Sequence, residues 1–116
     1  MHNFKKLEVW KRSVGLAVKI YTLTKTLDNS DQYIFSTQLN RCSVSIPSNV
    51  AEGSGKRTIK DFCNYLSIAL GSAFELETQL IILSEIHQSR SSEINFLLEE
   101  VIEIQKMIYV LRMNTN

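Results

Sequence analysis

The segment GSGKRT, from Gly53 to Thr58, joins glycines to a lysine and an arginine, a combination typical of loops that hold phosphate groups. A Walker A loop needs a glycine five positions before its Gly-Lys pair, where this chain has Val50. It also needs a serine or threonine directly after the lysine, where this chain has Arg57. The spacing therefore argues against nucleotide hydrolysis and leaves the segment as a basic turn.

This turn is one of two clusters of positive charge, and the other lies near the start of the chain. Lysine and arginine side chains bind nucleic-acid phosphates and release the counterions around them. In an up-down helical bundle the two clusters lie at the same end, where they can form one patch. The alternative is that both are solvated helix ends that only keep the chain soluble. The residues predicted to contact RNA or DNA backbone are Lys5, Lys6, Lys11, Arg12, Lys56, Arg57 and Lys60.

The histidines and cysteines lack the spacing of a metal site. A di-iron bundle requires Glu-x-x-His motifs, and neither His2 nor His87 has a glutamate three positions before it. Cys42 and Cys63 form no CxxC pair and lie in apolar segments, which indicates buried free thiols and a reducing, cytoplasmic location. We therefore predict no metal, no cofactor and no catalytic residues, and we expect that the protein is not an enzyme.

Three polar residues, Asn49, Glu52 and Glu75, fall on or beside the apolar faces of two predicted helices. A buried polar group without a hydrogen bond costs on the order of several kcal/mol. The three residues are therefore predicted to form a structural polar network that ties the second helix to the third. An acid–base pair of Glu52 and Glu75 is the alternative, but no nucleophile accompanies it.

Four amphipathic segments must position these groups. Apolar residues recur at three- and four-residue spacing, which predicts helices over about 6–27, 31–52, 58–88 and 92–113 of a single domain, residues 1–116. The short connections between them predict an all-α, antiparallel up-down-up-down four-helix bundle.

Local signals mark the helix ends. Ser30 is the predicted N-cap of the second helix, and Thr58 opens the third as part of a capping box. Pro47 predicts a kink inside the second helix. Gly53 and Gly55 predict that this helix ends in the left-handed conformation that glycine adopts without steric cost.

The helices carry more apolar surface than one core needs, which predicts oligomerisation. Gly71 and Ser72 predict a close helix–helix contact in the third helix. In the first helix the predicted core face is Leu7, Trp10, Val14, Ala17, Tyr21 and Thr24. A second stripe beside it is Leu16, Ile20, Leu23 and Leu27. The later helices add Ile68, Ile81, Ile82, Leu98, Ile102 and Tyr109.

The net charge of +1 conceals an asymmetry, because residues 1–60 carry +6 and residues 61–116 carry −5. This split predicts a polarised surface or head-to-tail association, whereas halves that lie side by side would largely neutralise each other. No apolar run approaches the roughly 20 residues of a membrane span, so no membrane partner is expected.

Longer runs of sequence carry a further signal: FKKLEVWKRSVGLAVKIYTLT, QLNRCSVSIPSNVAEG and SIPSNVAEGSGKRTIKDFCNYLSIALGSAFELETQL. With the motifs N-[IV]-A-E-G and A-x-G-S-x-x-E-L-E, the chain from about Phe4 to Leu111 resembles a bacterial four-helix bundle protein family. Members of this family are encoded in intervening sequences of large-subunit ribosomal RNA genes. The positions that match its motif, which we interpret as structural, are Asn49, Ala51, Glu52, Gly53, Gly71, Ser72 and Glu75.

The resemblance implies an antiparallel bundle that assembles into a homopentamer and has no catalytic residues. It also implies a relationship to the accessory variability protein of diversity-generating retroelements, a basic pentameric barrel that binds nucleic acid and partners a reverse transcriptase. This chain departs from that relative in its net charge of only +1. We expect a non-enzymatic, oligomeric accessory protein that binds RNA or DNA and has a reverse transcriptase or another protein as partner. The alternative is a protein–protein interaction or structural module with no nucleic-acid role.

Overall fold

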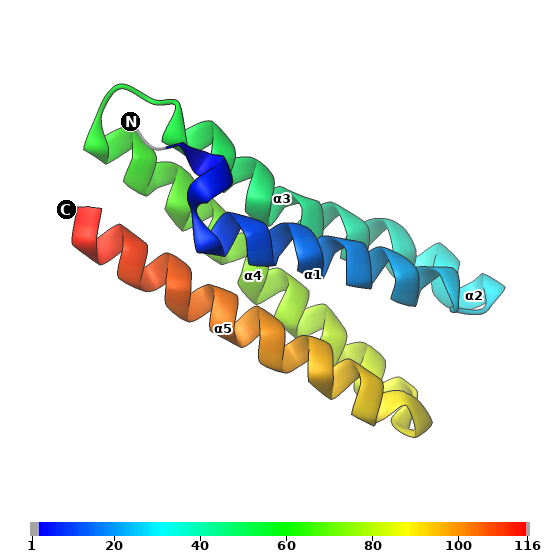
Figure 1. Cartoon of the computed structure of the whole chain (residues 1–116). Helices are drawn as coiled ribbons and strands as arrows, with labels where there is room; N and C mark the ends of the chain where they lie inside the picture. The colour runs from blue at the N-terminus through cyan, green and yellow to red at the C-terminus, as the bar shows by residue number, and fades with distance from the viewer. Residues whose placement is uncertain (1–2, 116) are drawn as a thin grey trace.

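Helices make up all the regular secondary structure of residues 3–115, the part of the chain that the computed structural model describes. Four of them are long, and consecutive long helices run in opposite directions (Figure 1). The predicted all-α class and four-helix bundle are thus confirmed. The long helices are α1 (Glu8–Lys25), α3 (Thr37–Ser54), α4 (Ile59–Ile86) and α5 (Ser91–Thr115).

Short helical elements join the long ones. The turn η1 (Phe4–Lys6) precedes α1, and η3 (Gln88–Arg90) joins α4 to α5. Between α1 and α3, the single turn α2 (Asn29–Asp31) and the π-helical turn η2 (Gln32–Ser36) run directly into α3. The predicted second helix is therefore one continuous helical segment with a π turn near its start.

The segment after α1 is capped by Asp28, and the prediction of Ser30 as its N-cap is wrong. The Asp28 carboxylate accepts a hydrogen bond from the backbone N–H of Asp31 at 3.0 Å, and the Ser30 hydroxyl donates to it at 3.1 Å. These two bonds lower the pKa of Asp28. An ionised acceptor forms stronger hydrogen bonds than a neutral hydroxyl, which favours Asp28 as the cap. At the start of α4 the predicted cap is present, because the Thr58 hydroxyl accepts from the N–H of Asp61 at 3.1 Å.

The end of α3 contains no left-handed glycine, so the predicted left-handed end at Gly53 and Gly55 is wrong. No glycine among residues 3–115 has a positive φ, and Gly55 caps the helix at φ −87°. Its N–H donates to the carbonyl of Glu52 at 3.2 Å. The helix runs through Pro47 without a break.

Gly53 is needed for space, not for an unusual backbone conformation. Here α3 and α4 approach so closely that a Cβ atom on Gly53 would lie 2.6 Å from the Cβ of Tyr65 and 3.1 Å from Cδ1 of Phe62. Carbon atoms pack best at about 3.5–4.0 Å. Any larger residue at position 53 would therefore force the two helices apart.

The close contact predicted in the middle of α4 is made by Ser72 and not by Gly71. Gly71 is exposed, and a Cβ atom there would meet nothing within 4 Å. The hydroxyl of Ser72 lies 2.8 Å from that of Ser45 and forms a hydrogen bond across the α3–α4 interface.

The face of α1 that packs in the core contains Leu16, Ile20 and Leu23, which belong to the second stripe predicted beside the core face. Leu16, Ile20 and Leu23 are at most 3% exposed, whereas Val14 and Tyr21 are 36% and 54% exposed. The prediction of Val14 and Tyr21 as core residues is therefore wrong.

Two hydroxyl groups are buried on the core side of α1, and one of them, that of Ser13, explains this error. The Ser13 hydroxyl donates to the carbonyl of Val9 at 2.6 Å. The Thr24 hydroxyl donates to the carbonyl of Tyr21 at 2.9 Å and accepts from the Asn40 side chain at 3.0 Å. Satisfied in this way, both hydroxyls can lie in the core at little cost. Thr24 is buried as predicted, whereas Ser13 interrupts the apolar pattern of the true core face in the sequence.

Large apolar side chains remain on the outer surface of the bundle. Of the predicted additional residues, Ile68, Ile81, Ile82 and Tyr109 are between 44% and 51% exposed. Such residues supply surface that a second chain could cover.

By length and composition, α4 could cross a membrane, since its best window has a mean hydropathy of 1.4. The core helix of a bundle passes the same test, and the inner face of α4, from Phe62 to Leu83, packs in the core.

Replacing Gly53 with alanine is expected to lower the free energy of unfolding by about 1–3 kcal/mol, because the added methyl group overpacks the α3–α4 contact. Gly71→Ala is the matched control. Open space and a helical backbone at that position predict a gain of about 0.5–1 kcal/mol. Urea unfolding followed by circular dichroism measures both values, and effects of the same sign would contradict the close approach at Gly53.

Candidate nucleic-acid interface

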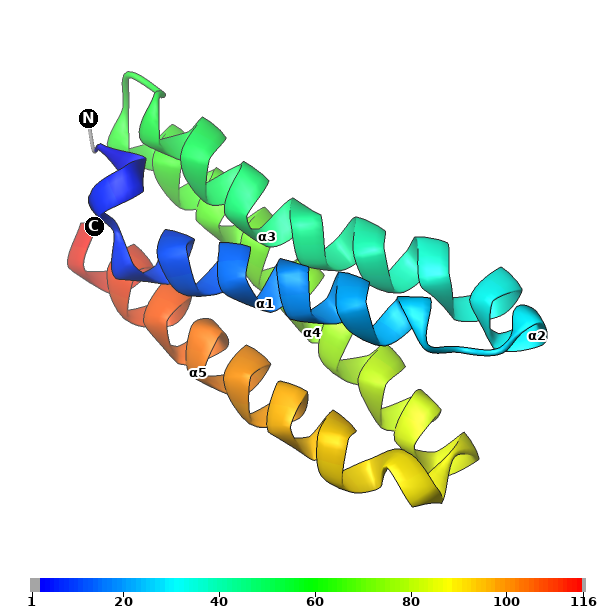
Figure 2. The same ribbon diagram turned by 45° about the vertical axis from the view of Figure 1, so that its right-hand side comes forward.

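Figures 1 and 2 place the start of the chain and the turn between α3 and α4 at one end of the bundle, beside the end of α5. Both α1 and α4 begin at this end, because consecutive long helices alternate in direction. Six of the seven residues predicted to contact nucleic acid belong to the segments at this end, and five of the six are exposed, while Lys56 is half-buried. We call this group the basic end: Lys5, Lys6, Lys11, Lys56, Arg57 and Lys60.

Asn3 and an aromatic pair position the first part of the basic end. The Asn3 side chain accepts a hydrogen bond from the backbone N–H of Lys5 at 3.3 Å and so caps η1. The Phe4 ring packs edge-on against the Trp10 ring, with 5.3 Å between the centroids. These contacts fix η1 against α1 and leave Lys5 and Lys6 exposed.

The turn after α3 holds the second part of the basic end. The ammonium group of Lys56 lies 4.0 Å from the Glu52 carboxylate and 5.1 Å from the centroid of the Tyr65 ring. The Tyr65 hydroxyl donates to the same carboxylate at 3.0 Å. Arg57 and Lys60 are exposed, and within residues 3–115 neither forms an ion pair with a carboxylate. Their charges are therefore free to attract phosphate.

Arg12, the remaining predicted contact residue, is held by α5. Its Nε and Nη2 donate to the Glu100 carboxylate at 2.9 and 2.8 Å, and its Nη1 lies 3.7 Å from the sulfur of Met107. The hydrogen bonds raise the pKa of Arg12 and lower that of Glu100. Such a two-bond pair offsets the charge of the arginine. Arg12 therefore joins α1 to α5, and we do not include it in the basic end.

Two further cations belong to the C-terminal half of α5 and were missed in the sequence. Arg112 donates to the hydroxyl of Ser67 at 3.0 Å and lies 5.6 Å from the centroid of the Tyr109 ring. Lys106 forms an exposed ion pair with Glu103 at 3.4 Å. The bundle topology was the available signal, because the fourth helix of an antiparallel bundle ends where the first begins.

The three residues predicted to tie the second helix to the third each take part in a link between α3 and α4, but the links are separate and do not form one network. Asn49 donates to the backbone carbonyl of Ser45 at 2.8 Å and to its hydroxyl at 2.9 Å, and that hydroxyl is hydrogen-bonded to Ser72 of α4. Glu52 accepts from Tyr65, as described above, and Glu75 forms an ion pair with Arg41. Positions 65 and 75 are separated by about 15 Å along a helix. Glu52 and Glu75 thus do not share a site, which argues against the acid–base pair.

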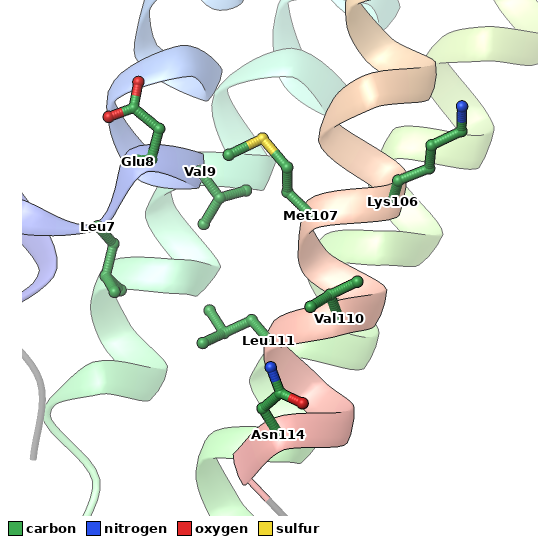
Figure 3. Close-up of a pocket in the computed structure, with 8 residues that line it drawn as sticks. All are labelled: Leu7, Glu8, Val9, Lys106, Met107, Val110, Leu111 and Asn114. Atoms are coloured by element: carbon green, nitrogen blue, oxygen red, sulfur yellow. The ribbon is translucent and has the colours of Figure 1, made fainter.

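An open apolar groove lies beside the basic end, between the start of α1 and the end of α5 (Figure 3). Its volume is about 390 Å³. The lining of this groove is mainly apolar, and its charged groups come only from Glu8 and Lys106. The groove therefore offers contact surface, because its lining contains no set of reactive side chains. The lining residues are Leu7, Glu8, Val9, Lys106, Met107, Val110, Leu111 and Asn114.

Comparisons with known proteins agree with the resemblance seen in the sequence motifs. Residues 5–110 match the family described as 23S rRNA-intervening sequence protein. The fold is similar to that in the crystal structure of a protein with unknown function from the S23 ribosomal protein family of Bacteroides thetaiotaomicron. The TM-score is 0.83 at 30% sequence identity, and the match covers 90% of this chain and 97% of that one. No match is found among curated proteins.

The Arg12–Glu100 pair predicts an acid-dependent loss of stability. Because the pKa of Glu100 is lowered in the folded state, the pair stabilises the fold above the ordinary glutamate pKa of 4.5. That contribution disappears as the pH falls through the folded-state pKa. At neutral pH, Glu100→Gln is expected to cost about 0.5–1 kcal/mol, since the pair is partly screened by solvent.

Urea unfolding at neutral and acidic pH measures this cost. The difference between the unsubstituted chain and Glu100→Gln should shrink below the ordinary pKa of glutamate, whereas Glu99→Gln, an exposed neighbour, should have little effect at any pH. A difference that stays constant down to acidic pH would contradict the assignment.

Proposed function

The chain belongs to the 23S rRNA-intervening sequence protein family, and we propose that this member is a non-enzymatic helical bundle whose basic end binds the phosphate backbone of RNA or DNA. One observation carries the proposal. Two segments about fifty residues apart in the sequence lie at the same end of the bundle (Figure 2), and both carry exposed lysine or arginine residues. At least Arg57 and Lys60 have no carboxylate partner within the described residues.

Binding would follow from the release of counterions when these cations meet phosphates. No base-reading motif accompanies the cations, so little sequence specificity is expected. The overall charge of +1 does not oppose this, because the negative charges concentrate in the second half of the chain and several are paired with arginines elsewhere.

Assembly into a cytoplasmic homopentamer is part of the proposal. It is supported by the exposed apolar side chains and by the family resemblance. If copies pack side by side with their long axes parallel, their basic ends lie on one side of the assembly. Several weak patches would then act on one polyanion, and their combined affinity would exceed that of a single patch.

A protein-interaction module is the second candidate, and the apolar groove in Figure 3 favours it. Val110 lines both this groove and a neighbouring one that also contains Phe74 and Tyr109. These side chains are more than half exposed, at 53%, 51% and 51%. A partner that covers them would bury apolar surface without needing the basic end.

Charge reversal at the turn tests nucleic-acid binding. Lys56→Glu with Arg57→Glu is expected to weaken binding at least tenfold and to lower the slope of log affinity against log salt by about 1.5–2. Fluorescence anisotropy of a labelled oligonucleotide over a salt series measures both. The control is Lys19→Glu with Lys25→Glu, the same change of charge further along α1. An equal loss in the control, or no binding at low salt, would refute the proposal.

Light scattering tests assembly. The unsubstituted chain is expected to form a pentamer, and Val110→Glu to shift it to smaller species, because a buried carboxylate without a partner is costly. Val110 is exposed, so its substitution should leave the bundle fold intact. Gln88→Glu, at the exposed turn after α4, is the control. A monomeric unsubstituted chain would contradict the prediction.

A further inference from the structure

The Tyr65 ring is held in a fixed position at the basic end. Its Cβ packs on the backbone of Gly53, where only glycine leaves enough room. Its hydroxyl donates to Glu52 at 3.0 Å, and the ammonium group of Lys56 lies 5.1 Å from the ring centroid. The last turn of α3 thus fixes an aromatic ring next to a cation that is proposed to bind phosphate.

A second aromatic pair lies in the other part of the basic end. Phe4 directly precedes Lys5 and Lys6, and Trp10 directly precedes Lys11. Both rings are half-buried and contact each other with 5.3 Å between the centroids. Aromatic and basic side chains therefore accompany each other in both segments that form the basic end.

Single strands and duplexes offer different groups to such a surface. A duplex presents its phosphates, while its bases are stacked on one another inside the helix. A single strand also presents the faces of its bases, and these stack on aromatic side chains with little dependence on sequence. Surfaces that combine cations with aromatic rings are typical of proteins that bind single strands.

We propose that the basic end binds single-stranded nucleic acid in preference to duplex, with a base stacked on Tyr65 and the neighbouring phosphates bound by Lys56, Arg57 and Lys60. This inference rests on the proposed function and specifies the strand form of its ligand. Lys56 can move from the ring face to a phosphate, because an exposed ion pair and an exposed ring contact each hold it only weakly.

The test compares the affinities of the unsubstituted chain for oligo(dT) and oligo(U) with those for their duplexes with complementary strands, by fluorescence anisotropy in low salt. Oligo(dT), oligo(U) or both should bind about tenfold more tightly than the matching duplex. If only one of them does, it identifies the sugar type that the protein prefers. This comparison needs no variant, so it remains decisive if a substitution disturbs folding.

Variants then assign the preference to the ring. Tyr65→Leu should weaken single-strand binding about tenfold and leave duplex binding nearly unchanged. Tyr65→Phe keeps the aromatic ring and should therefore bind single strands about as tightly as the unsubstituted chain. The control is Tyr21→Leu. Tyr21 also has a lysine over its ring, Lys25 at 5.0 Å, but lies in the second half of α1, away from the basic end.

The possible failures are distinguishable. If no strand binds, the proposed function fails together with this inference. If single strands and duplexes bind equally, or Tyr65→Leu weakens both alike, the proposed function stands and this inference is refuted.

Discussion

The close approach of Gly53 to Tyr65 constrains the turn between α3 and α4, which holds one of the two parts of the basic end. Because the backbone of Gly53 in the last turn of α3 lies directly against the Cβ of Tyr65 in the second turn of α4, the connection must reverse the chain within a few residues. The residues of this reversal are Gly55 to Thr58, and two cations of the basic end, Lys56 and Arg57, are among them. Thr58 then restarts the helix by accepting the N–H of Asp61. The contact that packs the two helices is thus also the contact that presents positive charge at the tip of the bundle.

Pairing of charges explains how a chain of nearly zero net charge can have a basic end. Three arginines outside the basic end are paired: Arg12 with Glu100, Arg41 with Glu75 and Arg90 with Glu93. In each pair the two opposite charges offset each other locally. The first pair joins α1 to α5 and the second joins α3 to α4. At the basic end, within the described residues, Lys56 alone has a carboxylate within 4.0 Å, that of Glu52, so the charges of the other cations are not offset at short range. Net charge alone therefore says little about what this surface can bind.

The sequence was sufficient for the number and direction of the long helices but not for every local signal, since Asp28 and not Ser30 caps the segment after α1. It was insufficient wherever distant contacts decide the outcome. Helical periodicity predicted the bundle, and the cap at Thr58 follows from a residue type at one position. The core face of α1 could not be predicted, because Ser13 interrupts its apolar pattern and is tolerated there only through a hydrogen bond to the carbonyl of Val9. Arg12 was assigned to the candidate interface because its partner, Glu100, lies 88 positions away. The role of Gly53 was equally hidden, since the clash that excludes other residues is with the next helix.

Lys56 shows how the scaffold and the proposed interface meet in one side chain. Its ion pair with Glu52 is 4.0 Å long, and the two side chains are 38% and 57% exposed. At that separation in a watery environment two unit charges attract by only about 1 kcal/mol, and an exposed cation over an aromatic ring gains about 0.5–1 kcal/mol. These contacts are strong enough to favour a position of Lys56 above Tyr65 when no ligand is bound. They are weak enough to be exchanged for a phosphate, whose binding also releases counterions. The residues that hold the Tyr65 ring, Gly53 and Glu52, therefore need not move when Lys56 does.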